Sequence, residues 1–235
     1  MKADEHRVGA SGGLVDDGWG GTFVNPFATR YVASARVAAR DPSGEPRDLE
    51  VLADRLAERG GSGALVGPHG AGKSTLLRQL AGVLARRSIP VHVIRVRRGA
   101  DTVDVLRGVR SVGRGGVACV DGWEVLGGAG RLAVRVAAWL GGVGIVVTAH
   151  RPGWPATFVE CRTTVSLLGA IVKTLPGHGT WFGDVIDADD LAACFSAGAG
   201  DLRLSLDLLY DLFEHRGRHV ETGLGRRGPA PTDRI

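Results

Sequence analysis

A glycine-rich loop between an apolar run and a leucine-spaced segment carries the clearest chemistry in this sequence. The apolar run covers residues 64–66, and the loop continues as Gly67, Pro68, His69, Gly70, Ala71, Gly72, Lys73, Ser74 and Thr75. Loop glycines allow successive backbone N–H groups to point at one anion. In this pattern Lys73 reaches the β- and γ-phosphates of a nucleotide, and the Ser74 hydroxyl holds Mg²⁺. The sequence therefore predicts a phosphate-binding P-loop over residues 67–75.

The residues after the loop predict the helix that this motif requires. Apolar side chains recur there at helical spacing, at Leu76, Leu77, Leu80, Val83 and Leu84. The positive end of such a helix faces the phosphates. A glycine-rich turn without a ligand is the alternative, but it does not need a strand before it and a helix after it.

A second apolar run ends in a carboxylate, as a Walker B strand does. Residues 117–120 are apolar and Asp121 follows them. An acid at this position can hold the water shell of a Mg²⁺ that Ser74 also binds, although an aspartate closing an ordinary strand has the same pattern. Glu124 follows three residues later, and it could act as a general base toward water or be a surface glutamate at a turn.

A third apolar run, residues 145–147, ends in Thr148 and His150. If this strand lies beside the Walker B strand, either side chain would be near the γ-phosphate and could report its presence. A histidine that only closes the strand is the alternative for His150.

The alternation of apolar strands with helices predicts the fold. Strands are expected near residues 64–66, 91–96, 116–121 and 144–148, and helices at 48–59 and 132–140. Continuous apolar strands of this kind form parallel sheets covered on both faces, and ligands bind at the carboxyl ends of the strands. The predicted fold class is α/β, a parallel-sheet P-loop NTPase (αβα sandwich) with a small C-terminal helical lid.

The expected domains follow from periodicity and composition. A tail without periodicity covers residues 1–20, the NTPase core covers 21–180, the lid covers 181–215, and a second tail covers 216–235. The lid is expected to contain two short helices, the first beginning near Asp187 and the second covering residues 202–214.

Composition limits the class of protein. The 235 residues are 44% hydrophobic with a formal net charge of +4, and no apolar stretch is uninterrupted over the length of a membrane span. We expect a cytoplasmic protein whose cysteines are buried thiols of a reducing compartment. Arginines concentrate in a basic segment that begins at Arg86 and ends at Arg114. This segment is either a solvated sheet edge or a patch for nucleic acid or an acidic protein partner.

These motifs resemble those of a known family. Asn25, Pro26 and Phe27, followed by a leucine-spaced helix and then the P-loop, look like the opening of AAA+ ATPases of the secretion and transposition type. The region of His150 is similar to their sensor 1 motif, in which an asparagine usually stands. Residues 200–203 resemble their sensor 2 motif, whose arginine, here Arg203, contacts the γ-phosphate. The resemblance implies ATP with Mg²⁺ as ligand and a homo-oligomer as the assembly.

Two positions depart from that family. AAA+ proteins normally place a glutamate directly after the Walker B aspartate, whereas Gly122 stands here, and the order of residues is more like the STAND group of signalling ATPases. Arg203 could also form a simple surface ion pair with Asp207, four residues on. Candidates for an arginine finger are Arg131, Arg135, Arg151 and Arg162.

The sequence therefore predicts an ATP-binding protein, a Mg-dependent AAA+-like ATPase that couples ATP binding and hydrolysis to conformational change. Its expected catalytic residues are Lys73, Asp121, Glu124, His150 and Arg203. One alternative is a nucleotide-binding regulatory switch or scaffold with negligible hydrolysis. Another is a small-molecule kinase, although no second substrate pocket with an acid-base pair can be recognised in the sequence.

Overall fold

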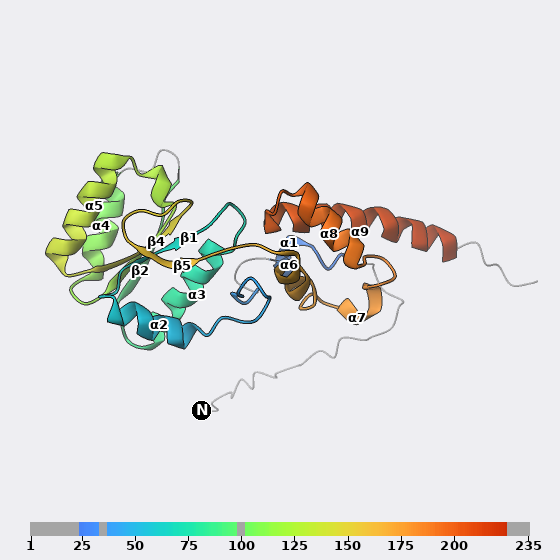
Figure 1. Cartoon of the computed structure of the whole chain (residues 1–235), viewed down its shortest axis with the longest axis horizontal. Coiled ribbons are helices and arrows are strands. Elements are labelled where there is room, and N and C mark those ends of the chain that lie inside the picture. The colour runs from blue at the N-terminus through green and yellow to red at the C-terminus, as the bar shows by residue number, and fades with distance from the viewer. Residues whose placement is uncertain (1–23, 33–36, 98–101, 225–235) are drawn as a thin grey trace, which may run out of the picture.

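The computed structural model describes residues 24–32, 37–97 and 102–224, with side chains up to Gly217. The predicted tail over residues 1–20 lies outside this range. The chain forms an α/β part and a helical part side by side (Figure 1). Within the described ranges, no helix combines the length and apolarity needed to cross a membrane.

The α/β part is built on a five-stranded sheet in which every pairing is parallel. Its strands are β1 (Gly63–Val66), β2 (Val91–Arg95), β3 (Val117–Asp121), β4 (Gly144–Ala149) and β5 (Thr157–Glu160). They are arranged in the order β2-β3-β4-β1-β5. The P-loop strand β1 and the Walker B strand β3 are therefore separated by β4, so the carboxyl end of β4 lies between the two motifs.

Helices cover both faces of this sheet. α2 (Leu49–Glu58) and α3 (Lys73–Arg86) share one buried cluster with Leu65 of β1, while α4 (Thr102–Val112) and α5 (Gly128–Gly141) share another with its neighbours Ala64 and Val66. Successive strand residues point to opposite faces, so a strand buried on both faces must be apolar throughout. This arrangement confirms the predicted α/β parallel sheet. The cysteine thiols are buried and free, and burial raises the pKa of Cys119 to about 12.

The N-terminus of α2 shows why the sequence forms a helix where predicted. The Asp48 side chain accepts hydrogen bonds from the backbone N–H groups of Glu50 and Val51, which satisfies two of the donors that a helix leaves open at its start. Two elements of the α/β part, α4 and β5, were not anticipated from the sequence.

The helical part has a core of its own. It contains α1 (Thr29–Val32), α6 (Val165–Val172), α7 (His178–Trp181), α8 (Ala188–Ala197) and α9 (Leu202–Leu224). Phe27 is 2% exposed and lies 5.3 Å from the ring of Trp181 and 5.9 Å from that of Phe213, measured between centroids. The segment before α1 therefore belongs to the helical part, and a boundary at residue 180 would divide this packed cluster between α6 and α8.

The last helix is longer than predicted. The sequence indicated a helix ending at residue 214 and a tail from residue 216, but α9 continues to Leu224. Arg216 donates hydrogen bonds to the Asp190 carboxylate of α8 at 2.6 and 2.9 Å and to the Val185 carbonyl at 2.7 Å. The predicted start of the tail is wrong, because residue 216 lies within α9 and its side chain contacts α8 across 26 residues of sequence. Residues 225–235 of that tail lie outside the described part of the chain.

Candidate functional site

The P-loop connects β1 to α3 and holds its lysine inward. Gly72, with φ of 75°, is the last residue before α3, and Lys73 is the first residue of the helix. The Lys73 ammonium, in a side chain only 8% exposed, donates hydrogen bonds to the carbonyls of Gly67 at 2.7 Å and Pro68 at 2.5 Å. Burial lowers the pKa of Lys73, although Cys161 and nearby carboxylates act in the opposite direction.

Two loop glycines lie where no side chain fits. A Cβ on Gly67 would lie 2.2 Å from the Cys161 carbonyl oxygen that follows β5, and a Cβ on Gly70 would lie 1.9 Å from the Asp201 carboxylate. Gly70 also has φ of +68°, a conformation that glycine adopts without strain. The loop is therefore enclosed between the edge of the sheet and the helical part.

The Walker B carboxylate lies next to the P-loop hydroxyl. Asp121 is 9% exposed, and its Oδ1 accepts hydrogen bonds from Ser74 Oγ at 2.8 Å and from Thr148 Oγ1 at 2.9 Å. Thr148 Oγ1 in turn accepts a hydrogen bond from the Gly122 N–H at 2.9 Å. Since β4 lies between β1 and β3, Thr148 lies between the P-loop and the Walker B strand. The structure thus brings Ser74 and Asp121 together, as the two sequence motifs require.

Arg95 is a neighbour of Asp121 that sequence reasoning did not select as a site residue. Its Nε lies 3.8 Å from Asp121 Oδ2, because Arg95 and Asp121 are paired residues at the ends of β2 and β3. The available signal was a charged residue closing an apolar strand, the same signal that identified Asp121. In the sequence, Arg95 belongs to the run of arginines that forms the basic segment.

Gly122 occupies the position at which AAA+ proteins normally carry a glutamate, and the backbone explains why no side chain is present. Its φ is +100°, and a Cβ there would lie 2.7 Å from the Val96 carbonyl oxygen. The acid follows instead on the short 3-10 helix Trp123–Val125. Glu124 accepts a hydrogen bond from the backbone N–H of His150, and its Oε2 lies 4.0 Å from His150 Nε2.

His150 lies between the P-loop and Glu124. Its ring centroid is 3.9 Å from that of His69 in the P-loop, at an interplanar angle of 41°. Burial lowers the pKa of His150, and the nearby charges of Lys73, His69 and Arg151 add to this effect while Glu124 opposes it. The neutral imidazole is thus the favoured form near neutral pH.

The helical part contributes one wall of the site. Asp201 caps α9 by accepting hydrogen bonds from the N–H groups of Arg203 at 2.8 Å and Leu204 at 3.3 Å, and it lies against Gly70 of the P-loop. Arg203 and Asp207 both face the same pocket, and among the described residues no ion pair joins them. The alternative of a simple surface pair is therefore not what the structure contains.

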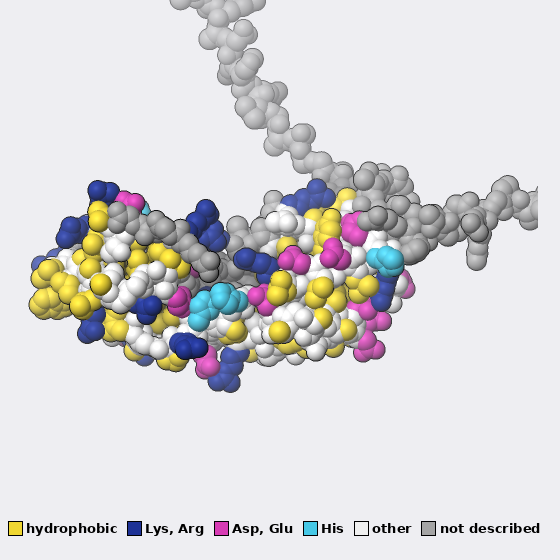
Figure 2. All heavy atoms as spheres, turned by 90° about the horizontal axis from the view of Figure 1, so that it is seen from above, with side chains coloured by type: hydrophobic (Ala, Val, Ile, Leu, Met, Phe, Trp, Pro, Cys, Tyr) yellow, Lys and Arg dark blue, Asp and Glu magenta, His cyan; other side chains and the backbone are white. Residues whose placement is uncertain are grey.

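We call the resulting cavity, of about 710 Å³, the P-loop pocket. Its basic lining residues are Arg40, Arg47, Lys73, Arg78, Arg95, Arg162 and Arg203. Its acidic lining residues are Asp121, Glu124, Asp201 and Asp207. Histidine side chains lie where the two parts of the molecule meet (Figure 2). The excess of basic groups around backbone N–H donors favours a multiply charged anion.

A neighbouring segment covers the pocket from the N-terminal side. Gln79 of α3 donates to the Val37 carbonyl and accepts from the Ala39 N–H, both at 2.8 Å. Residues 37–40 thereby line the pocket together with Thr29 and Val32 of α1. No pattern in the sequence predicts this placement, because a glutamine side chain, rather than a strand ladder, holds the segment.

The arginines of the basic segment 86–114 do not form one surface. Arg87 pairs with Glu50 of α2 at 2.8 Å, near the amino end of β2. Arg95 lies at the carboxyl end of the same strand and faces the P-loop pocket. Arg98 lies outside the described residues. A role of this segment in binding nucleic acid or an acidic protein stays a prediction.

Solved structures share this fold. RuvB of Thermotoga maritima, titled a Holliday junction branch migration motor, superimposes with a TM-score of 0.51 at 20% identity, over 75% of this chain and 61% of that chain. Its R170A variant matches with a TM-score of 0.50 at 21% identity, over the same shares. The chain therefore shares the fold of RuvB, in which a parallel α/β sheet is joined to a helical part. It spans less than two thirds of the length of RuvB. Neither a protein-family model nor a curated protein sequence matches it.

The fold shared with RuvB agrees with the AAA+ resemblance noted in the sequence, and the secretion and transposition type stays a prediction. The structure brings Lys73, Asp121, Glu124, His150 and Arg203 to one pocket. Their individual catalytic roles stay predictions. The four candidates for an arginine finger divide between two places: Arg162 lines the P-loop pocket, and Arg131, Arg135 and Arg151 line a second cavity.

Proposed function

We propose that this chain binds ATP with Mg²⁺ in the P-loop pocket and acts as an AAA+-type ATPase that couples binding and hydrolysis to movement of the helical part. The observation that carries the proposal is the 2.8 Å hydrogen bond between Ser74 Oγ and Asp121 Oδ1 beside the Lys73 ammonium. A hydroxyl, a carboxylate and an inward lysine at the N-terminus of a helix are the groups that this chemistry requires.

The donor set fits a magnesium ion. Ser74 and Asp121 present hard oxygen atoms, which Mg²⁺ prefers, and their number is small enough to leave positions for water and phosphate. When bound, Mg²⁺ would neutralise charge on the phosphates. Thr148 and Arg95 keep the Asp121 carboxylate in place through contacts at 2.9 and 3.8 Å, so the ligand atom is oriented by its surroundings.

Lys73 and the loop N–H groups would bind the phosphates. The Lys73 ammonium is bonded only to loop carbonyls among the described residues, and its lowered pKa reflects burial without a full counter-charge. A phosphate anion beside Lys73 would supply the missing negative charge and stabilise the ammonium form. Arg203 lines the same pocket from α9, so an anion there would connect the two parts of the molecule.

Glu124 is our candidate for the general base. Its carboxylate is held by the His150 N–H at the edge of the P-loop pocket, where it could accept a proton from water. The same hydrogen bond favours the second candidate function, a nucleotide-gated switch with negligible hydrolysis, because it engages one of the two carboxylate oxygens and leaves only the other for a water molecule. Gly122, which cannot carry the usual acid, favours that alternative as well.

Phosphate release separates the two functions. We expect ATP turnover by the unmodified chain, a loss of about 100-fold or more in Glu124→Gln, and no change in Glu58→Gln, an exposed glutamate on α2. Binding of ATP should persist in all three proteins. Saturable ATP binding without turnover above background would establish the switch instead, and absence of ATP binding would refute both.

The assembly and its target belong to the proposal as well. A homo-oligomer is implied by the AAA+ resemblance, and the solution mass with and without a non-hydrolysable ATP analogue tests it. Stimulation of turnover by double-stranded DNA would favour a nucleic-acid partner for the basic segment. Turnover that double-stranded DNA leaves unchanged, but that an acidic protein stimulates, would favour an acidic protein as the partner.

A further inference from the structure

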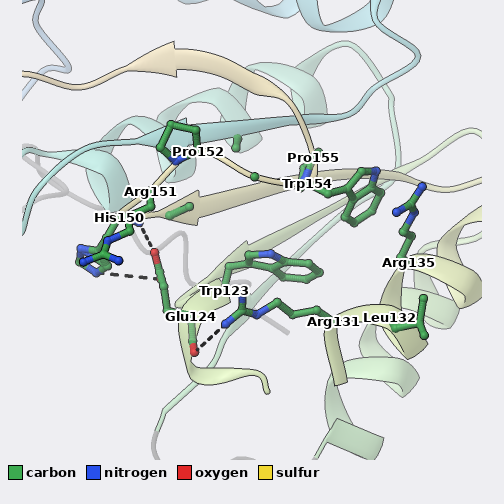
Figure 3. A pocket seen from close by; sticks show the side chains of 13 residues that line it. Trp123, Glu124, Arg131, Leu132, Arg135, His150, Arg151, Pro152, Trp154 and Pro155 are labelled. Carbon is green, nitrogen blue, oxygen red and sulfur yellow. Dashed lines mark hydrogen bonds and ion pairs between the residues drawn. The ribbon is translucent and has the colours of Figure 1, made fainter. Parts of the chain in front are cut away.

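A second cavity of about 470 Å³ lies beside the P-loop pocket, and tryptophans and arginines form much of its wall (Figure 3). The rings of Trp123 and Trp154 are 5.9 Å apart between centroids, and the Arg135 guanidinium lies 4.9 Å from the centre of the Trp154 ring. In Figure 3 the two indoles lie toward α5, whereas Glu124 and His150 lie at the opposite end. We call this cavity the tryptophan pocket.

The tryptophan pocket continues into an apolar face of α5 that no described part of the chain covers. The exposed residues are Leu132 at 60%, Val136 at 45%, Trp139 at 80% and Leu140 at 71%. Their spacing of four, three and one residues places them on one side of the helix. Figure 2 shows hydrophobic side chains gathered at the end of the molecule where Figure 1 places α5.

Such a face is unusual for a monomer. The buried residues Val134 and Ala138 already attach α5 to the α/β core, so the outward stripe is not needed for folding. Contiguous exposed apolar surface with an accessible tryptophan marks an interaction site. Leu132 also lines the tryptophan pocket, so the stripe and the cavity form one surface, which we call the α5 docking surface.

The charge of this surface indicates its partner. Three arginines and one acid, Glu124, line the tryptophan pocket, and that acid is engaged by the His150 N–H. Arg131 is satisfied by the Leu126 carbonyl at 2.6 Å. No carboxylate among the described residues pairs with the other two, Arg135 and Arg151. An apolar cavity bordered by uncompensated guanidinium groups is complementary to an apolar side chain flanked by acids.

We propose that the α5 docking surface binds an acidic segment of a partner protein, which inserts an aromatic or branched apolar side chain into the tryptophan pocket. Carboxylates of that segment pair with Arg135 and Arg151, and its apolar side packs on Trp139 and Leu140. A concave pocket of this size fits one anchoring side chain, whereas a lipid bilayer offers a flat surface with no group that would fill it. The cavity therefore favours a protein segment over a membrane.

The α5 docking surface adjoins the proposed nucleotide site, so a partner bound there can affect ATP turnover; this part of the inference rests on the proposed function. Glu124 and His150 line both the tryptophan pocket and the P-loop pocket. A side chain entering the first pocket contacts the groups that hold the candidate base. Binding of the segment should therefore change the rate of ATP turnover as well as the occupancy of the surface.

The test uses the full chain without nucleotide and a fluorescein-labelled peptide with the sequence Glu-Asp-Trp-Leu-Asp-Glu, followed by fluorescence anisotropy. Two matched peptides complete the set: one replaces every acid by lysine, and one replaces Trp-Leu by Ser-Gly. We expect saturable binding of the acidic apolar peptide alone. Trp154→Ala and Arg135→Glu should each weaken it by about tenfold or more, and Arg107→Glu on α4 should leave it unchanged. Far-UV circular dichroism confirms that each variant is folded.

Several results would overturn the proposal: equal binding of the acidic and basic peptides, equal binding by the Trp154 variant, or binding of phosphatidylglycerol vesicles without binding of any peptide. A dimer that dissociates in Trp139→Ser would also overturn it, since the face would then bind a second copy. The Lys73→Ala variant keeps the two proposals distinct. It should bind the peptide normally although its affinity for ATP falls. Peptide binding by the unmodified chain without any ATP binding would sustain the docking surface and refute the nucleotide proposal.

Discussion

Replacing Thr148 by valine removes one hydroxyl from the centre of the site and preserves the shape of the side chain. Thr148 is 3% exposed. Its hydroxyl donates to Asp121 Oδ1 and accepts from the Gly122 N–H, both at 2.9 Å. The variant therefore deprives a carboxylate of one donor and leaves one backbone N–H without its acceptor.

The magnitude follows from these two losses. A buried donor without a partner costs about 1–3 kcal/mol, and a hydrogen bond to a charged group contributes about 1.5–3 kcal/mol. Asp121 keeps the Ser74 hydroxyl at 2.8 Å and the Arg95 guanidinium at 3.8 Å, so the second loss is partly compensated. We expect the free energy of unfolding to fall by about 2–4 kcal/mol.

Urea unfolding followed by circular dichroism measures this change. The matched control is Thr180→Val, because the exposed Thr180 hydroxyl donates to the Gly177 carbonyl within its own turn, and its removal should change the free energy by about 0.5 kcal/mol or less. A Thr148→Val protein as stable as the control would refute the hydrogen-bonded link between β3 and β4 on which the placement of Asp121 depends.

The remaining predictions concern the backbone, the helical part and pH. Gly122→Ala should lower the free energy of unfolding by more than about 1 kcal/mol, because φ is +100° and the added Cβ would lie 2.7 Å from the Val96 carbonyl oxygen; thermal unfolding measures it. Arg216→Ala should destabilise the helical part by about 1 kcal/mol, measured by hydrogen exchange of α9, because Asp190 loses its partner. The pKa of His150, followed by NMR titration, should lie below its ordinary value because burial disfavours the imidazolium. The unfolded chain then binds the proton more readily, so stability falls as pH decreases through this range.

A control measurement accompanies each of these predictions and defines the result that would contradict it. Gly127→Ala has open space around its Cβ and should cost much less than Gly122→Ala; equal costs would contradict the close approach to Val96. Arg107→Ala removes an exposed pair with Asp104 and should leave hydrogen exchange in α9 unchanged. If α9 exchanges no faster in Arg216→Ala than in Arg107→Ala, the anchoring of α9 by Arg216 is contradicted. A His150 midpoint at or above that of an unstructured histidine peptide would contradict its burial.

Local patterns accounted for the parts of the site that are continuous in sequence. The P-loop, the Walker B strand and β4 were predicted because a strand end, a polar residue and glycines at fixed spacing lie within a few residues of one another. The order β2-β3-β4-β1-β5 then brings Thr148 between Ser74 and Asp121. Helix α2 was predicted to within its caps because Asp48 and a leucine stripe both act locally.

The remaining features depend on contacts between distant segments. Phe27 joins the helical part through Trp181 and Phe213, and neither partner can be inferred from the neighbours of Phe27 in the sequence. Helix α9 extends beyond its apolar stripe because Arg216 reaches Asp190. Strand β5 was missed because its four residues, Thr157–Glu160, are too few to show a period.

The valines and the glycine of α4 explain why the sequence did not predict this helix. Its sequence is rich in β-branched residues and contains Gly108, a composition of low helix propensity. Val105, Val109 and Val112 are nevertheless buried against the sheet. Tertiary packing thus overrides local preference over a segment that the sequence indicated only as basic.

Isothermal titration calorimetry of the full chain with ATP and Mg²⁺ tests the central claim most directly. The comparison is between Lys73→Ala, which removes the ammonium bonded to Gly67 and Pro68, and Lys173→Ala, which removes an exposed lysine of the helical part. We predict one binding site in the unmodified chain and in Lys173→Ala, and affinity weakened by about 10- to 100-fold or more in Lys73→Ala. Equal affinities of the two variants, or no binding by the unmodified chain, would contradict the account.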